Sequence, residues 1–447
     1  MIKTFINAWK VADLRKKILF TAFIVLIFRI GAAIPVPFIV AGGIQNTSEL
    51  YSGTFIQYLN MMTGNAFNMG TVFALSISPY INASIIIQLL TVAIPYLEKL
   101  SKDGEEGRKK ISKITRYTTV GLAAMQSIAY YIYLRSQNAV VTGKDGAMLS
   151  GFPAVFAGMV IVFCLTAGST LIMWLGEQVN EHGIGNGISI ILFAGIVARV
   201  PTMCVNIYQY FMSGKTVPAY YALTPVLIIG LLGMIAYIVW MDNAERRIPV
   251  QYAKRVVGRK MYGGQSTHIP IKVNMCGVLP IIFASSILSI PSTVQMFLVN
   301  KITEGSFWDK FFGIFSSEHW AYAIMYFVLI LFFAYFYASI QYDPIEMANN
   351  IRKNSGMIPG IRPGKPTSDY ITKILSRIVL LGALLISVVA LLPILFQLFT
   401  AMVLPENYSM SVSMGGTSII IVVGVALETV KQLESMMMMR HYKGFLD

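Results

Sequence analysis

The stretch "SISPYINASIIIQLLTVAIPYL", from Ser76 to Leu97, contains no charged residue. A helix of this length crosses the hydrocarbon core of a bilayer, which is about 30 Å thick. It nevertheless carries Pro79, Asn82 and Gln88, which a helix that only contacts lipid does not need. The stretch therefore predicts a membrane-spanning helix with a role beyond anchoring.

The composition of the whole chain indicates a membrane protein. Of 447 residues, 55% are hydrophobic and only 13% are charged, about half the charged share of a soluble globular protein. No polar block is long enough to form a separate soluble domain. The cysteines, Cys164, Cys204 and Cys276, lie far apart without metal-binding spacing, and we interpret them as reduced core residues.

Apolar runs of about 20 residues predict an all-α integral membrane protein with ten spans. The predicted spans are 18–36, 76–97, 117–134, 153–175, 188–205, 220–240, 272–292, 319–340, 374–396 and 411–430. The uncharged segment 54–73 is too polar for a span and too apolar for an ordinary loop. We interpret it as a short re-entrant helix, because irregular backbone at membrane depth must be shielded by protein or by a water-filled cavity.

The distribution of lysine and arginine predicts the orientation of the chain. If both termini are cytoplasmic, 28 of the 35 basic residues fall on the cytoplasmic side and six fall outside, with Arg29 inside the first span. This asymmetry follows the positive-inside rule and accounts for the net charge of +14. The cytoplasmic loops 98–116, 241–271 and 341–373 are large and basic, so we expect soluble partners to dock on that face.

Residues with catalytic or cofactor-binding potential are few. None of the four histidines, His182, His268, His319 and His441, has a metal-spaced partner. "PGIRPGKPT" (359–367) fails the phosphate-loop pattern, because Pro366 follows Lys365 where that pattern requires Ser or Thr. The sequence therefore predicts no enzyme activity, cofactor or metal, and another protein must supply any energy for transport.

The polar residues of 76–97 follow a pattern along one side of the predicted helix. At 100° per residue, Ile77, Ile81, Ser84, Gln88 and Thr91 fall on one stripe that is apolar at its outer end and polar at its cytoplasmic end. Asn82 lies opposite. Such a stripe is typical either of helix–helix packing or of a helix that lines a water-filled funnel, and periodicity leaves both interpretations open.

The same stretch resembles the second span of the SecY family, which forms the pore of bacterial protein-translocation channels. Other stretches match the family in its order, between residues 15 and 431. They are "FRIGAAIPVP" (28–37), "GRKKISKITRY" (107–117), "LIMWLGEQVNEHGIGNGISIILFAGIVA" (171–198), "RRIPVQYAKR" (246–255), "QSTHIPIKVNMCGVLPIIFASSI" (265–287), "GMIPGIRPGKPT" (356–367) and "GGTSIIIVVGVALE" (415–428). The outer loops, the sixth span and the C-terminal tail match weakly.

The resemblance implies an hourglass pore between two pseudo-symmetric inverted halves of five helices, closed at its waist by an aliphatic ring. The ring residues would be Ile77, Ile81, Ile188, Leu192, Ile282 and Ile421. Flexible aliphatic side chains can close around an extended chain, and a dry constriction resists ions by dewetting. Without the resemblance, ordinary core packing would be the expectation for any one of these residues.

The resemblance also assigns the moving parts of the channel. Segment 54–73 would be the plug that blocks the outer funnel at rest, with Gly64 and Gly70 lending it flexibility. The second and seventh spans would flank a lateral gate, with Gln88 and Asn274 as its polar residues. Polar side chains there would make gate opening responsive to an apolar signal sequence.

The basic loops would serve for docking. The resemblance implies contacts with the SecA motor ATPase or the ribosome through Arg255, Arg259 and Lys260 in one loop and Arg362 in another. Arginine pairs bidentately with carboxylates and phosphates, so it suits both partners. SecE-like and SecG-like small membrane subunits, polypeptides bearing signal sequences and the lipid bilayer complete the expected partners.

The resemblance thus implies the central subunit of a protein-conducting channel in the bacterial cytoplasmic membrane, and the charge distribution predicts that both termini are cytoplasmic. An inverted-repeat secondary transporter of a small substrate is the alternative, and it would need a buried charged or ion-coordinating cluster. The expected organisation is an amphipathic segment 1–17, an N-terminal half 18–205, a C-terminal half 206–430 and a tail 431–447.

Overall fold

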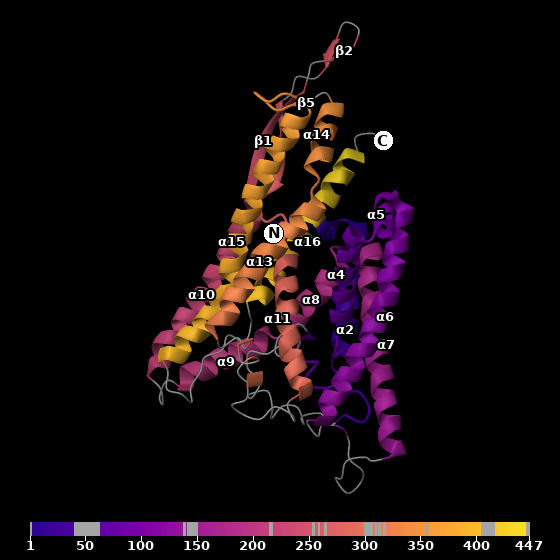
Figure 1. Cartoon of the computed structure of the whole chain (residues 1–447), viewed down its shortest axis with the longest axis vertical. Coiled ribbons are helices and arrows are strands. Elements are labelled where there is room, and N and C mark those ends of the chain that lie inside the picture. Colours follow the sequence, from indigo (N-terminus) through magenta and orange to yellow (C-terminus); the bar gives the residue numbers. More distant parts are fainter. Residues whose placement is uncertain are drawn as a thin grey trace.

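The computed structural model is a bundle of long helices with a small sheet projecting from one end (Figure 1). The structure describes residues 2–39, 63–136, 140, 151–213, 218–252, 255–257, 260–262, 266–298, 307–308, 311, 314–315, 319–354, 356–403 and 416–443.

The first part of the chain is mainly helical and is coloured from indigo to magenta in Figure 1. Its helices are α1 (Ile2–Lys10), α2 (Ala12–Gly31), α4 (Ser78–Ala93), α5 (Pro95–Lys102), α6 (Gly104–Ser136), α7 (Phe152–His182), α8 (Gly187–Val197) and α9 (Val200–Ser213). Helix α6 packs against both α4 and α7, and α8 packs against α7.

The second part of the chain contributes the remaining helices and all the strands. In chain order they are α10 (Ala219–Asn243), β1 (Glu245–Tyr252), β2 (Arg255–Val257), β3 (Lys260–Tyr262), β4 (Ser266–Lys272), α11 (Leu279–Leu298), α13 (Trp320–Gln341), α14 (Pro344–Lys353), β5 (Gly356–Met357), α15 (Lys365–Val403) and α16 (Gly416–Lys443). Helix α13 packs on α11 and α15, while α16 contacts α8 and α1 of the first part. The boundary expected at residues 205 and 206 falls within α9, and the division into halves stays a prediction.

The helical fold class is confirmed, whereas the number of spans is not. Helix covers most of every predicted span, but by length and hydropathy six described helices can cross a membrane, or seven if a bent pair counts as one span. The bent pair is α4 and α5, which turn by 106° within the stretch predicted as one straight helix. Ile94 adopts extended backbone because the ring of Pro95 disfavours helical geometry in the preceding residue.

Two further boundaries differ from the predictions. Residues 98–116, predicted as a loop, are mostly helical, in α5 and the first turns of α6. The predicted span 272–292 becomes helical only at Leu279, because strand β4 extends to Lys272 and turns follow it. An apolar run marks membrane depth and cannot by itself show where helix begins.

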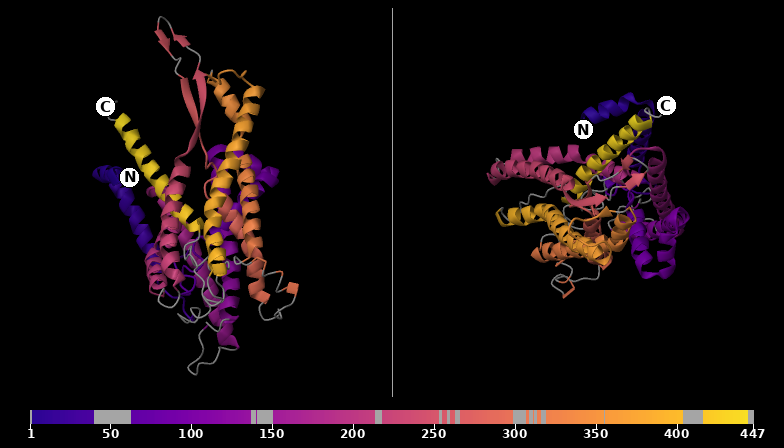
Figure 2. Two further views of the ribbon diagram at one scale, coloured as in Figure 1. Left: turned by 90° about the vertical axis from the view of Figure 1, so that its left-hand side faces the viewer. Right: turned by 90° about the horizontal axis from the view of Figure 1, so that it is seen from above.

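A two-stranded ribbon rises beyond the helices, as the left view of Figure 2 shows. Strands β1 and β4 pair antiparallel from Glu245 opposite Lys272 to Gln251 opposite Ser266. Strand β5 pairs with the far end of β1, and β2 pairs with β3 beyond it. The ribbon, α5 and α14 lie at one end of the bundle, which we call the ribbon face (Figure 1). The sequence predicted basic loops here, without the strands.

Apolar side chains occupy both the inside and the outside of the bundle. The central cluster of buried residues joins α2, α7, α8, α10, α11, α13, α15 and α16, and α4 packs against it through Tyr80, Ile81 and Ile85. On the outside, Phe163 of α7 is 72% exposed and Ile229 of α10 is 69% exposed. Exposed apolar faces of this extent match a lipid environment rather than water.

Candidate functional site

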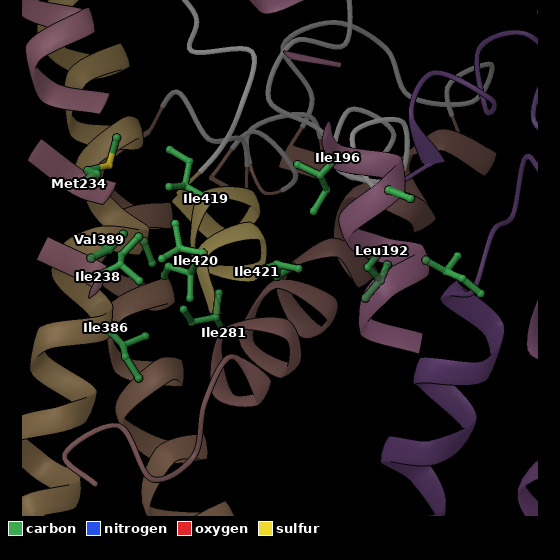
Figure 3. Packing of buried hydrophobic residues seen from close by; sticks show 14 of the residues in the cluster. Leu192, Ile196, Met234, Ile238, Ile281, Ile386, Val389, Ile419, Ile420 and Ile421 are labelled. Atoms are coloured by element: carbon green, nitrogen blue, oxygen red, sulfur yellow. The ribbon is translucent and has the colours of Figure 1, made fainter. Parts of the chain in front are cut away.

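The six predicted ring residues come from four helices, α4, α8, α11 and α16. Five of them belong to or pack against the central cluster: Ile77, Ile81, Ile188, Leu192 and Ile421. Leu192 and Ile421 lie on neighbouring helices, with Ile421 directed toward α8 (Figure 3). Ile282 is also buried but does not belong to that cluster, to which α11 contributes Ile281, Phe283, Ala284 and Leu288. Five of the six thus belong to or border one large apolar cluster, and their arrangement and action as a ring stay a prediction.

A tight turn sets the start of α4. Ser76 has a φ of +47°, and its carbonyl oxygen accepts a hydrogen bond from the hydroxyl of Ser169 on α7. The helix then begins with Pro79 in its first turn, where a missing N–H costs nothing. Ile77 caps this turn at 1% exposure, and the amide of Ile81 donates to its carbonyl oxygen at 3.1 Å. The turn therefore places both isoleucines at the inner end of α4.

Polar side chains hold α8 in place. The side-chain oxygen of Asn186 caps the helix by accepting from the amide of Ile188 at 3.1 Å. Asn180 of α7 accepts from the amide of Gly187 at 2.8 Å. The two helices approach so closely that a Cβ on Gly187 would lie 2.0 Å from the carbonyl oxygen of Gly176. Residues 183–187, "GIGNG", thus form the junction between α7 and α8 and orient Ile188 and Leu192.

We expect Gly187→Ala to destabilise the channel, since one extra carbon must push α7 and α8 apart. The cost of overpacking is about 1–3 kcal/mol. Thermal unfolding of the purified protein in detergent should show a lowered Tm. Gly230→Ala in α10 is the matched control, because a Cβ there meets nothing within 4 Å. Equal Tm values for the two variants would contradict this account of the junction.

Close packing likewise fixes the start of α16. A Cβ on Gly416 would lie 2.2 Å from the carbonyl oxygen of Val389 on α15. The hydroxyls of Thr417 and Tyr326 on α13 lie 3.2 Å apart, within hydrogen-bonding distance. Together these contacts direct Ile421, 3% exposed, toward the centre of the bundle.

The predicted plug, 54–73, is described only from Thr63, and residues 54–62 lie outside the described residues. Segment 63–76 packs against α6 and α7. The hydroxyl of Tyr130 donates to the carbonyl of Phe67, and Gly70 accepts from the amide of Val36 at 2.9 Å. Gly168 of α7 leaves room for the backbone of Val72, whose oxygen would lie 2.1 Å from an added Cβ. The segment is therefore seated on the first part of the chain.

Gly64 lies in a left-handed turn of this segment, close to the backbone of α8. Its φ is +66°, and an added Cβ would lie 2.8 Å from both Nη1 of Arg29 and the carbonyl oxygen of Gly195. Nη1 of Arg29 is buried and makes no hydrogen bond to the described residues. A buried guanidinium nitrogen without a partner is costly, so displacement of the segment that admits water would relieve that cost.

The predicted gate residues do not bond to each other. Along the predicted stripe of α4, exposure rises from the buried Ile77 through the half-buried Ile81 and Ser84 to the exposed Gln88. Asn274 precedes α11 and donates its amide to Oδ1 of Asp242 on α10, at 2.8 Å. Its own oxygen is buried and makes no hydrogen bond to the described residues. Sequence reasoning missed Asp242, because a single acidic residue beside the end of a span resembles an ordinary helix terminus.

Sequence reasoning also missed an ion pair between α6 and α7. Nε of Arg116 lies 2.7 Å from Oε1 of Glu177, whose side chain is 16% exposed. The predicted span 153–175 ends before Glu177, whereas α7 continues to His182. The pair fastens the two helices at their ribbon-face ends. A basic residue and an acidic residue 61 positions apart show no periodic signal in the sequence.

The described docking residues, Arg255, Lys260 and Arg362, lie on the ribbon face (Figure 1). Arg362 is exposed between Gly360 and Gly364, whose φ values are +80° and +108°. The hydroxyl of Thr367 donates to the carbonyl oxygen of Arg362 at 2.9 Å, which fixes the turn before α15. Arg255 and Lys260 begin strands β2 and β3, and Arg259 lies outside the described residues. Within the described parts of the chain, no group of His, Cys, Asp and Glu could hold a metal.

Comparisons with known proteins agree with this geometry. The SecY family model matches residues 71–430. The chain is 42% identical to the protein translocase subunit SecY of Mycobacterium bovis, over the full length of both chains. It is also 42% identical over full length to the protein translocase subunit SecY of Streptomyces galbus.

Solved structures show the same fold. A structure described as a protein-conducting channel superposes with a TM-score of 0.63 at 18% identity, covering 94% of this chain and 92% of the other. Sec61 in a canine ribosome–channel complex gives 0.58 at 16% identity, with the same coverage. The transporter alternative finds no support in these comparisons. The resemblance in the sequence is confirmed: the chain belongs to the SecY family.

Proposed function

We propose that the chain is the pore-forming subunit of a channel that moves unfolded secretory polypeptides across the bacterial cytoplasmic membrane and releases membrane segments sideways into lipid. The convergence of aliphatic side chains from α4, α8 and α16 in one central cluster carries this proposal, together with membership of the family. The chain supplies a path and no chemistry, so it is not an enzyme.

The aliphatic cluster would act as the seal of the pore. Ile77, Leu192 and Ile421 are 1–5% exposed, and Ile81 and Ile188 are half-buried, which supports a constriction that is largely closed to water. Aliphatic side chains have no hydrogen-bonding groups and change rotamers at low cost, so they can separate around an extended chain and close behind it. A dry constriction of this kind resists ions by dewetting.

The ribbon face would be the cytoplasmic face, with both termini on that side. Segments 98–116, 241–271 and 341–373, which carry most of the basic residues outside the N-terminus, lie at this end of the bundle (Figure 1). Their charge matches the positive-inside rule. Arg255, Arg259, Lys260 and Arg362 would bind a motor ATPase or the ribosome, and small SecE-like and SecG-like subunits would bind in the membrane.

The route can be tested by crosslinking a stalled precursor to the channel. In a variant without Cys164, Cys204 and Cys276, single cysteines replace Ile81 or Ile282 and meet a cysteine in the precursor. Both positions should form a disulfide, since both would line the waist. Phe163→Cys is the control and should form no disulfide, because Phe163 is 72% exposed on the outside of the bundle. Absence of a crosslink at both pore positions would refute the proposed path.

A further inference from the structure

The root of the ribbon holds the end of α10 beside the chain that leads into α11. Glu245 pairs with Lys272 at the last step of the ladder. One residue further, the amide of Val273 donates to the carbonyl oxygen of Ala244 at 2.9 Å. The Asp242–Asn274 hydrogen bond, at 2.8 Å, continues this connection with side chains. The ribbon and the residues preceding α11 are thus joined by backbone and side-chain bonds in series.

The surroundings of Asn274 belong to the second part of the chain. A Cβ on Gly382 of α15 would lie 2.4 Å from the oxygen of Val273 and 3.9 Å from Cα of Asn274. A Cβ on Gly424 of α16 would lie 3.8 Å from Oδ2 of Asp242. Close-packed backbones leave the Asn274 side chain little freedom. Its direction therefore depends on Asp242, its hydrogen-bond partner among the described residues.

The chemistry of that partner sets the direction of the amide. A carboxyl group that accepts a hydrogen bond attracts the NH₂ group and repels the amide oxygen, so the reversed orientation is disfavoured. Asp242 therefore turns the NH₂ group of Asn274 toward α10 and leaves its oxygen without a partner among the described residues. Without Asp242 the residues that lead into α11 would lose this side-chain bond to α10.

We propose that Asp242 is a positioning residue of the lateral gate, which restrains Asn274 and so sets how defective a signal sequence can be and still open the channel. This inference rests on the proposed function. Asp242 itself contacts no substrate, and it acts by keeping the polar group at the start of α11 bound to α10 while the gate is closed. Loss of the bond should favour the open gate and make the channel accept weaker signals.

The test exchanges the two side chains. Asn274→Asp alone places two carboxyl groups at about hydrogen-bonding distance, where their mutual repulsion breaks the bond. Adding Asp242→Asn restores an amide–carboxyl pair with its direction reversed. Export of a precursor with a crippled signal sequence is measured against an intact precursor in the same cells, with the amount of channel in the membrane determined by immunoblot.

The expected result is that Asn274→Asp and Asp242→Ala each raise export of the crippled precursor roughly tenfold, the size of effect that loss of a hydrogen bond to a charged group produces. The exchanged pair should return to the wild-type value. Asp242→Ala combined with Asn274→Ala should have no larger effect than either alone, because both remove the same bond. Asn243→Ala is the matched control, since Asn243 is exposed and donates only within its own helix, to Val239.

Three outcomes would overturn the inference: Asp242→Ala behaving like Asn243→Ala, additive effects in the double variant, or an exchanged pair as permissive as Asn274→Asp. A merely structural role for Asp242 would lower export of both precursors instead of changing their ratio. Failure of the proposed function is distinguishable, because it would appear as absent crosslinks at Ile81 and Ile282 whatever residue occupies position 242.

Discussion

Arg362→Glu is expected to abolish translocation while the channel still folds and inserts into the membrane. Arg362 is exposed at the ribbon face, in a turn that two left-handed glycines and the Thr367 bond hold in one shape. A fixed guanidinium can bind a carboxylate or phosphate of a partner through two parallel hydrogen bonds. Glutamate would repel the same group, so the substitution replaces an attraction with a repulsion.

Cell fractionation and export of a wild-type precursor measure this result. Arg352→Glu is the control, because Arg352 is an exposed arginine in the same segment, 341–373, but lies in the last turn of α14. It should leave export close to normal, whereas Arg362→Lys should retain part of it through charge alone. Normal secretion through Arg362→Glu channels would show that the turn serves no docking role.

Gly64→Ala is expected to make the resting channel leak ions. The φ of +66° costs an alanine about 1–2 kcal/mol. The new carbon would also lie 2.8 Å from the backbone oxygen of Gly195, which cannot move without moving α8. The segment would therefore be displaced, and the proposed plug of which it is a part would no longer close the outer funnel.

Ion flux into proteoliposomes that contain the purified channel measures the leak. Gly121→Ala in α6 is the control, because a Cβ there meets nothing within 4 Å. Export of an intact precursor should continue in both variants, since the path itself is unchanged. A Gly64→Ala channel as tight as wild type would mean that this contact has no part in closure.

The sequence predicted the helices well because each apolar run records burial in lipid, which depends on local composition alone. The break at Ile94 could also have been predicted from Pro95, but the uninterrupted apolar run favoured one continuous helix. Strands β1 and β4 were missed because their pattern is short and basic, and the pairing joins residues 15 to 27 positions apart. Long-range pairing leaves little trace in a single sequence.

The candidate site was likewise predicted only in part from the sequence. Periodicity placed Ile77, Ile81 and Gln88 on one stripe, and the structure shows exposure rising along it toward the ribbon face. Periodicity could not show that α8 and α16 bring Leu192 and Ile421 to the same place; family resemblance supplied that expectation. Neither could reveal that Asn274 bonds to Asp242 rather than to Gln88, because this choice depends on how α10 and the residues before α11 pack.

The ribbon also has a mechanical consequence. Its seven residue pairs make an arm about 23 Å long, at about 3.3 Å per residue. A sideways displacement of about 2 Å at the far end of an arm of this length would rotate the arm by about 5° at its base. The Asp242–Asn274 bond lies at that pivot. A partner bound far from the membrane could thus bend the chain beside α11 without touching a helix.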